Sequence, residues 1–315
     1  MTTLPLFSYP LTVTLVDDDP LMLQALESVL KQSYQLNIFN TPTDAVNYFD
    51  SYTPLLPSIK LLHGCTELEN YDISGHLPVD VNFNVSKELI NHPKRQKETS
   101  VIIVDYNMPG INGIELCRKL KSLPLKKILL TGEANDRLAI DAFNEGIIDC
   151  FIRKDSPSLA DDLHCHLTIL TQHYFETITT QLLKHLETDH PLPASDPVFI
   201  TFFKEWCQAH RIKEYFIIDQ NANFVLLNDN NEESFFITHT DRTLRNFIEL
   251  NEDDQDLSSF IKLISAREKI PFFGNDNESW KVRHTEWDKH LVTPQVLIGR
   301  EKYYWATIKS EGVNQ

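Results

Sequence analysis

The segment Leu11-Thr-Val-Thr-Leu-Val-Asp-Asp-Asp-Pro20 decides the fold of the first half of this 315-residue chain. Its first six residues are β-branched or apolar, which predicts a buried strand. Three aspartates and a proline follow, and the apolar spacing over 21–30 predicts a helix directly after them. A second run, Val101-Ile-Ile-Val-Asp-Tyr-Asn-Met-Pro-Gly110, again predicts a buried strand that leads into an aspartate. Both runs therefore place carboxylates at the point where a strand ends.

Strands and helices alternate along the first 185 residues, apart from one interruption. Further strands are predicted at 35–39, 128–130 and 150–152, and further helices from 43, over 113–120 and over 136–144. This alternation is typical of an α/β fold with a doubly wound parallel sheet, here of five strands. Ligands bind at the carboxyl ends of the strands in such sheets. The residues that fall at this edge are Asp17, Asp18, Asp105, Thr131 and Lys154.

The interruption covers about 51–99 and has no clear periodicity. Its prolines and glycines are Pro54, Pro57, Gly64, Gly75, Pro78 and Pro93. Such a stretch is typical of an insertion with little regular structure. His63, Cys65 and His76 within it are potential metal ligands, but histidines and cysteines without regular spacing rarely bind a metal.

A long helix is predicted over about 158–188. Its apolar residues follow one another at steps of three or four and form a single stripe, which is Leu159, Leu163, Leu167, Leu170, Tyr174, Ile178, Leu182 and Leu186. A five-stranded sheet covers only the first half of this stripe, so the rest requires the second domain or a second subunit. The segment 190–197 contains three prolines, as a linker does. We therefore expect a first domain over 1–185, a linker over 186–198 and a second domain over 199–315.

The second domain is expected to be a small α+β unit. A hairpin is predicted at 214–219 and 224–229, around Gln220-Asn-Ala-Asn223. Further strands are predicted at 234–238 and 303–308, and helices at 198–209, 243–250 and 257–270.

The first domain resembles the receiver domain of two-component response regulators. The matching segments are Val16-Asp-Asp-Asp-Pro20, Val104-Asp-Tyr-Asn-Met-Pro-Gly110 with Gly113 following, Leu130-Thr-Gly132 and Phe151-Ile-Arg-Lys154. Their order, residue types and predicted strand context all agree with the family. The resemblance covers about 11–50 and 99–170.

This resemblance implies a role for each matched residue. Asp105 is the expected acceptor of a phosphoryl group from the phosphohistidine of a histidine kinase. Asp17, Asp18, Asp105 and the backbone carbonyl of Asn107 are the expected Mg²⁺ ligands, and such oxygens are the ligands that Mg²⁺ prefers. Lys154 is expected to balance the phosphoryl charge. Thr131 and Phe151 are the expected switching hydroxyl and switching aromatic side chain, which change the exposed surface after phosphorylation.

Two departures from the family pattern stand out. Asp155 follows Lys154, where the family usually has a proline joined by a cis bond. A cis bond to a non-proline residue is costly, so the bond is either trans with a different loop or cis with strain. The sequence separation of Asp18 from Asp105 is also about twice the usual one, and we assign the surplus to the insertion.

The net charge is −16, and neither half of the chain is basic. From Leu186 onward there are 14 Lys/Arg and 22 Asp/Glu, which gives −8 and leaves −8 for the first 185 residues. Domains that bind nucleic acid usually carry an excess of cations. The charge therefore disfavours a conventional transcription-factor output.

Three classes of output domain remain open. The first is a protein-interaction or dimerisation module, which the acidic charge favours. The second is a divergent nucleic-acid-binding domain that regulates transcription, whose sign would be a surface cluster of Arg242, Arg245, Lys262, Arg267 and Lys269. The third is an enzyme that uses Asp219, Asp229 and His239, although a hairpin explains them equally well as turn and strand-end residues.

The sequence as a whole predicts a response regulator that switches its own phosphorylation state and has no other enzymatic activity. Five scattered cysteines fit a reducing cytoplasm, and neither a signal peptide nor a membrane span is expected. The expected partners are a histidine kinase and, on phosphorylation, a second copy of the chain. Low glycine, high asparagine and the unusual second domain also resemble the Lqs-type quorum-sensing response regulators.

Overall fold

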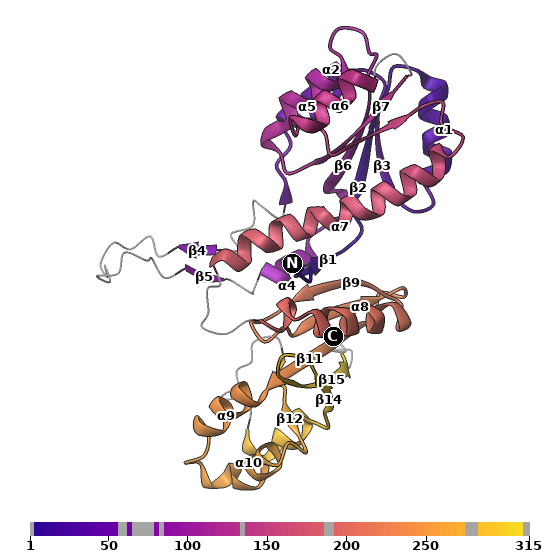
Figure 1. The fold of residues 1–315 in the computed structure, drawn as a ribbon. Coiled ribbons are helices and arrows are strands. Elements are labelled where there is room, and N and C mark those ends of the chain that lie inside the picture. The colour runs from indigo at the N-terminus through magenta and orange to yellow at the C-terminus, as the bar shows by residue number, and fades with distance from the viewer. Residues whose placement is uncertain are drawn as a thin grey trace. The chain divides into compact units, whose positions relative to one another are not determined.

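The computed structural model describes residues 3–55, 62–64, 79–81, 85–132, 136–185, 192–274 and 283–310, and the chain divides into two units (Figure 1). One unit is Tyr9–His185, and the other combines Met1–Ser8 with Leu186–Gln315. This division differs at the N-terminus from the expected one, which placed the first eight residues in the first domain. They belong to the second unit because β1 (Phe7–Ser8) pairs antiparallel with β9 (Ile212–Ile217).

The first unit contains a five-stranded parallel sheet in the order β3-β2-β6-β7-β8. The strands are β2 (Thr12–Val16), β3 (Gln35–Phe39), β6 (Thr99–Asp105), β7 (Lys126–Thr131) and β8 (Cys150–Arg153). Every residue of β2 and β6 is buried, since helices cover both faces of the sheet. The predicted doubly wound parallel sheet is confirmed.

Two layers of helices enclose this sheet (Figure 1). On one face, α1 (Pro20–Leu30) and α7 (Leu159–His185) supply a leucine-rich core that includes Leu26 and Leu167. On the other, α2 (Pro42–Asp50), α5 (Gly113–Lys119) and α6 (Asp136–Asn144) pack through residues such as Phe49, Leu116 and Ala142. Asp19 caps α1 by accepting a hydrogen bond from the backbone N–H of Leu21 at 2.9 Å.

The insertion contains more regular structure than we expected. Strands β4 (Leu62–Gly64) and β5 (Val79–Val81) pair antiparallel, and α4 (Val85–Asn91) and the 3₁₀ turn η1 (Arg95–Lys97) follow. Cys65 and His76 lie outside the described residues, so the hypothesis of a metal site there stays a prediction.

The long helix α7 has 27 residues and a length of about 40 Å. Its own unit covers part of its second half, because β5 contacts it and the Tyr9 ring meets Phe175 edge-on at 5.0 Å. The Tyr9 and Tyr174 hydroxyls also both donate to the buried Glu98 carboxylate, each at 2.7 Å. The expectation that this half needs the second domain or a second subunit was therefore wrong in part, because the insertion and the segment before β2 supply part of the surface that covers it.

The second unit is built on a six-stranded antiparallel sheet in the order β1-β9-β10-β11-β15-β14. Its other strands are β10 (Phe224–Asn228), β11 (Glu233–Thr240), β14 (Gln295–Ile298) and β15 (Lys302–Lys309), with a separate pair of β12 (Ile270–Pro271) and β13 (Leu291–Val292). Its helices are α8 (Pro197–Ala209), α9 (Asp241–Glu249) and α10 (Ser258–Ser265). The predicted α+β architecture is confirmed.

An aromatic core joins α8 to this sheet. Phe203 of α8 contacts Phe224 and Phe236 at centroid distances of 4.6 and 5.1 Å. Trp305 stacks on Phe236 at 5.4 Å and extends this core along β15. None of the helices in the described ranges combines the length and the apolar character that crossing a bilayer requires.

Candidate functional site

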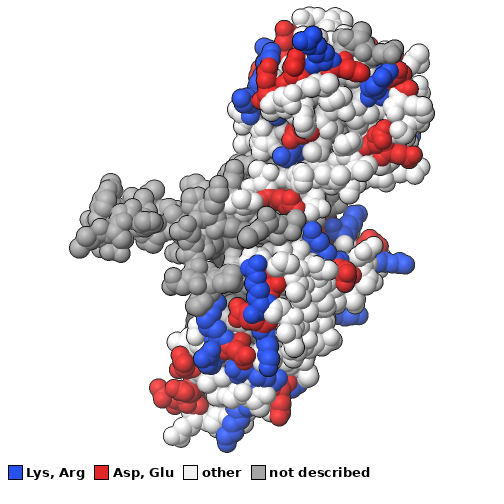
Figure 2. Space-filling view, viewed as in Figure 1, with Lys and Arg blue, Asp and Glu red and all other residues white. Residues whose placement is uncertain are grey.

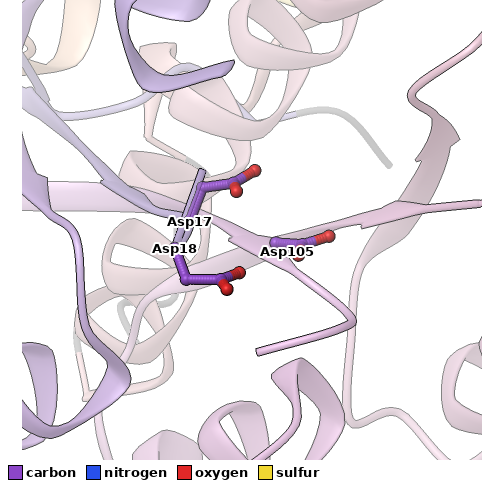
Figure 3. A group of neighbouring side chains, drawn as sticks. All are labelled: Asp17, Asp18 and Asp105. Atoms are coloured by element: carbon purple, nitrogen blue, oxygen red, sulfur yellow. The ribbon is translucent and has the colours of Figure 1, made fainter. Parts of the chain in front are cut away.

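Three carboxylates meet at the carboxyl ends of β2 and β6. The two strands are hydrogen-bonded neighbours with Val16 opposite Val104, so the aspartates that follow are brought together. Asp17, Asp18 and Asp105 each offer an oxygen within 4.8 Å of the others, and their side chains project to the same side (Figure 3). Asp18 is exposed, whereas Asp17 and Asp105 retain only 1% and 5% of their accessible surface. The sequence prediction placed these three residues at one edge, and the structure brings them together.

Lys154 supplies the positive charge of this cluster. It follows β8, and its Nζ lies 2.7 Å from Asp17 Oδ2 and 2.9 Å from Asp105 Oδ1. Its backbone N–H donates to the Thr131 carbonyl at 2.9 Å, which fixes the start of the loop. Burial alone would lower the pKa of Lys154, but hydrogen bonds and charges of Asp17 and Asp105 outweigh it and raise that pKa. Lys154 is therefore a permanent cation at physiological pH.

The single charge of Lys154 does not neutralise the three carboxylates of the cluster. Burial raises the pKa of Asp17, and the Lys154 hydrogen bond opposes this shift only in part. Three carboxylates against one ammonium leave a net charge of −2, and like charges at this spacing repel strongly away from water. Oxygen ligands with excess negative charge suit a hard divalent cation such as Mg²⁺. Asn107 lies two residues after Asp105, so its carbonyl is near enough in the chain to join them.

The loop after Asp105 folds back onto the site. Tyr106 N–H donates to the Leu130 carbonyl at 2.9 Å, and Gly113 N–H donates to the Tyr106 carbonyl at 3.0 Å. A Cβ at Gly113 would lie 2.3 Å from the Asp105 carbonyl oxygen and 2.8 Å from Leu129 Cδ1. Only glycine therefore allows α5 to begin this close to Asp105, a requirement that the sequence pattern carried but did not explain.

Thr131 and Phe151 lie on the strands next to Asp105. Thr131 is fully buried at the end of β7, and its hydroxyl has no hydrogen-bond partner among the described residues. A buried hydroxyl without a partner costs about 1–3 kcal/mol, so a new acceptor beside it would be favourable. Phe151 in β8 is half-buried against the core cluster under α5 and α6.

The Lys154–Asp155 peptide bond is trans, since no described peptide bond is cis. The Asp155 carboxylate accepts two hydrogen bonds from the Arg153 guanidinium, at 3.0 and 2.8 Å. This pairing lowers the pKa of Asp155 and neutralises the charge that the sequence brings next to the site. Arg153 also lies 3.9 Å from Asp136 at the start of α6. The sequence analysis did not predict this role of Arg153. An arginine two residues before an aspartate could have indicated that the two side chains form an ion pair.

The alternative catalytic candidates in the second unit have local structural partners. Asp219 accepts hydrogen bonds from the backbone N–H groups of Asn221 and Asn223, at 2.8 and 3.3 Å, as a turn residue does. His239 Nε2 lies 2.9 Å from the Pro271 carbonyl. Asp229 is exposed in the turn after β10.

The first unit is similar to known receiver domains. The response regulator receiver domain family matches residues 74–164, a range that contains Asp105, Thr131 and Lys154. The structure of the Legionella pneumophila response regulator LqsR is similar over 97% of this chain and 89% of that chain, with 27% sequence identity and a TM-score of 0.75. Among curated proteins, none resembles the chain closely enough to count as a match.

Two further solved structures align with about half of the chain. The adenylate cyclase from Rhodopirellula baltica is 19% identical, over 57% of this chain and 99% of that one, with a TM-score of 0.39. The signal receiver domain of an HD domain-containing protein from Pseudomonas fluorescens Pf-5 is 20% identical, over 55% and 91%, with a TM-score of 0.35. Neither likeness is close enough to bear on what this chain does.

Gly113→Ala is expected to destabilise the first unit by about 1–3 kcal/mol, because the new methyl group forces the backbone away from Asp105. Helix propensity alone would make the alanine variant more stable by about 1 kcal/mol. The predicted change in the free energy of unfolding therefore has the opposite sign. The measurement is the urea midpoint of unfolding. Gly132→Ala is the control, since its Cβ would meet nothing within 4 Å. Equal stability of the Gly113 variant and the wild type would contradict the tight approach.

Proposed function

We propose that this chain is a response regulator and that a histidine kinase switches its receiver domain by phosphorylating Asp105. The observation that carries the proposal is the placement of the Asp105 carboxylate, 2.9 Å from Lys154 Nζ and within 4.8 Å of the Asp17 and Asp18 oxygens. A carboxylate in such surroundings can take a phosphoryl group without a further general base.

The reaction forms one bond and breaks one. A carboxylate oxygen of Asp105 bonds to phosphorus while the phosphorus–nitrogen bond of the donor phosphohistidine breaks, and the electron pair stays with the imidazole. Such transfers depend mainly on positioning and on neutralising the phosphoryl oxygens. Lys154 would supply one positive charge, and Mg²⁺ held by Asp17, Asp18, Asp105 and the Asn107 carbonyl would supply the rest when bound.

Thr131 and Phe151 would convert this local charge into a change of surface. A phosphoryl oxygen on Asp105 would give the Thr131 hydroxyl, which has no partner in the described ranges, an acceptor. Asp105 lies opposite Leu130, the residue before Thr131, in the β6–β7 ladder. Movement of Thr131 would leave space for the half-buried Phe151 to turn inward. The surface affected is that of α6 and β8.

Asp105→Asn is expected to abolish phosphorylation by acetyl phosphate in the presence of Mg²⁺, because the amide nitrogen and oxygen replace the nucleophilic carboxylate. Intact mass spectrometry measures the gain of one phosphoryl group. Asp50→Asn serves as the control, since Asp50 is an exposed aspartate of the same unit outside the cluster. A phosphorylated Asp105→Asn variant would show that another residue is the acceptor.

We propose further that phosphorylation promotes homodimerisation. The support is the surface of α6, where Leu138, Ile140 and Phe143 are 46–49% exposed on a helix of nine residues. Ile140 and Phe143 are three positions apart and therefore neighbours on one side of α6. Exposed apolar side chains grouped in this way mark sites of interaction. The long helix α7 is the weaker candidate, since part of its second half is covered within its own unit.

Ile140→Ser is expected to lower the association constant of the phosphorylated dimer at least about tenfold, since about 1.4 kcal/mol of apolar contact is lost. Sedimentation velocity with and without acetyl phosphate measures it. Leu21→Ser on α1 is the matched control, being 75% exposed and outside this surface. A protein that stays monomeric after phosphorylation would overturn the dimer proposal while leaving phosphorylation at Asp105 intact.

For the second unit we favour a protein-interaction output, in quorum-sensing signalling, given the likeness to an Lqs-type regulator. Basic and acidic side chains alternate on the face of this unit shown in Figure 2. Of the five cations that would form a nucleic-acid surface, Arg267 pairs with Asp241 at 2.8 Å and Lys269 donates to Thr293. Nucleic-acid binding is therefore the second candidate.

A further inference from the structure

The second unit contains a cavity of about 300 Å³ beside the start of α9. Its walls come from the turn between β9 and β10, the end of β11, α9, Pro271 of β12 and the turn before β15. The volume equals roughly ten water molecules at 30 Å³ each, which is the size of a small organic molecule.

Part of the cavity lining is apolar. The residues are Leu192, Pro193, Phe247, Leu250 and Pro271. Leu250 is 84% exposed, although it lies directly after α9 in a unit with a well-formed core. An apolar ligand group placed here would cover the Leu250 side chain and remove it from water.

The remaining lining is polar and carries one charge of each sign. Gln220, Asn221 and Asn246 contribute amides, whereas the Thr240 and Thr243 hydroxyls already accept hydrogen bonds in the capping box of α9. The charged groups are Arg242 and Glu301. Neither forms an ion pair or a side-chain hydrogen bond with any residue that the structure describes, including the other. Asp241, the residue before Arg242, does have partners: its carboxylate accepts hydrogen bonds from Arg267 and from the Tyr304 hydroxyl.

His239 adds a polar edge without adding charge. It is 7% exposed, and burial lowers its pKa to about 4, so it is neutral at physiological pH. With Nε2 donating to the Pro271 carbonyl, Nδ1 is left as an acceptor, 3.4 Å from the Thr243 hydroxyl. The cavity lining therefore contains one cation, one anion, several neutral polar groups and apolar side chains.

We propose that this cavity binds a small zwitterion of the free amino-acid type with an apolar side chain. The ligand carboxylate would pair with Arg242, its ammonium group with Glu301, and its side chain would pack against Phe247 and Leu250. A ligand with a single charge could form an ion pair with only one of Arg242 and Glu301. The other side chain would then remain without an ion pair to the ligand. This role goes beyond the phosphorylation switch and does not depend on it, and it would give the second unit a second input.

The test is isothermal titration calorimetry of the full chain with L-leucine, L-methionine and L-phenylalanine. Two analogues of leucine each lack one charge: 4-methylpentanoate has no ammonium group, and 3-methylbutylamine has no carboxylate. At least one of the three amino acids is expected to bind, and leucine, if bound, at least about tenfold more tightly than either analogue. Absence of binding by all three at millimolar concentration, or equal binding of the analogues, would overturn the proposal.

Two substitutions assign the charged groups. Arg242→Gln is expected to weaken the binding of the amino acid about tenfold or more, and Glu301→Gln to weaken it similarly while leaving the weak binding of 4-methylpentanoate unchanged. Arg245→Gln is the matched control, because Arg245 is an exposed arginine on the same helix that does not line the cavity. Circular dichroism of each variant verifies the fold. Unchanged affinity in both folded variants would exclude this cavity as the binding site.

Discussion

The repulsion among three carboxylates at the ends of β2 and β6 is the constraint on which the first unit depends. The ladder between these strands fixes Asp17, Asp18 and Asp105 side by side, and two of the three are almost fully buried. Lys154 lies within 3 Å of two of them and offsets part of this repulsion. The position of Lys154 is in turn set by the bond from its backbone N–H to the Thr131 carbonyl. The residues that set and position the charges of the site therefore lie at the ends of four strands, β2, β6, β7 and β8.

Several local features follow from keeping that balance. Gly113 lets α5 begin against the Asp105 carbonyl, so the loop between them stays short and closed. Arg153 holds the Asp155 carboxylate, so the residue that replaces a proline adds no free negative charge beside Lys154. On the proposed function, phosphorylation adds charge at this point, and the Thr131 hydroxyl, which has no partner among the described residues, is the group best placed to respond. A small electrostatic change would then reach the exposed apolar surface of α6.

Much of the receiver could be predicted from the sequence, because parallel strands bring their carboxyl ends to one edge and the acidic residues follow those strands. The pairing of β1 could not, since two residues have no periodicity and their partner lies more than 200 positions away. The end of α10 was placed several residues too late, because Arg267 adopts a left-handed conformation with φ 62° that its residue type does not announce. The edge strand β14 was missed, as Val296 and Ile298 are exposed and their run is short. Cavity-lining residues such as Arg242 and Glu301 are separated by almost 60 positions, and only the fold brings them together.

On the proposed function, the carboxylates at the ends of β2 and β6 would bind Mg²⁺ around Asp105. The most direct measurement is thermal unfolding of the receiver over a Mg²⁺ titration, for the wild type and for Asp18→Asn. Mg²⁺ at about ten times its dissociation constant is expected to stabilise the wild type by about 1.4 kcal/mol, a rise of roughly 3–6 °C. Asp18→Asn should lose most of this rise, and Asp50→Asn should keep it. A wild type that does not respond to Mg²⁺, or an Asp18→Asn variant that responds equally, would contradict the account.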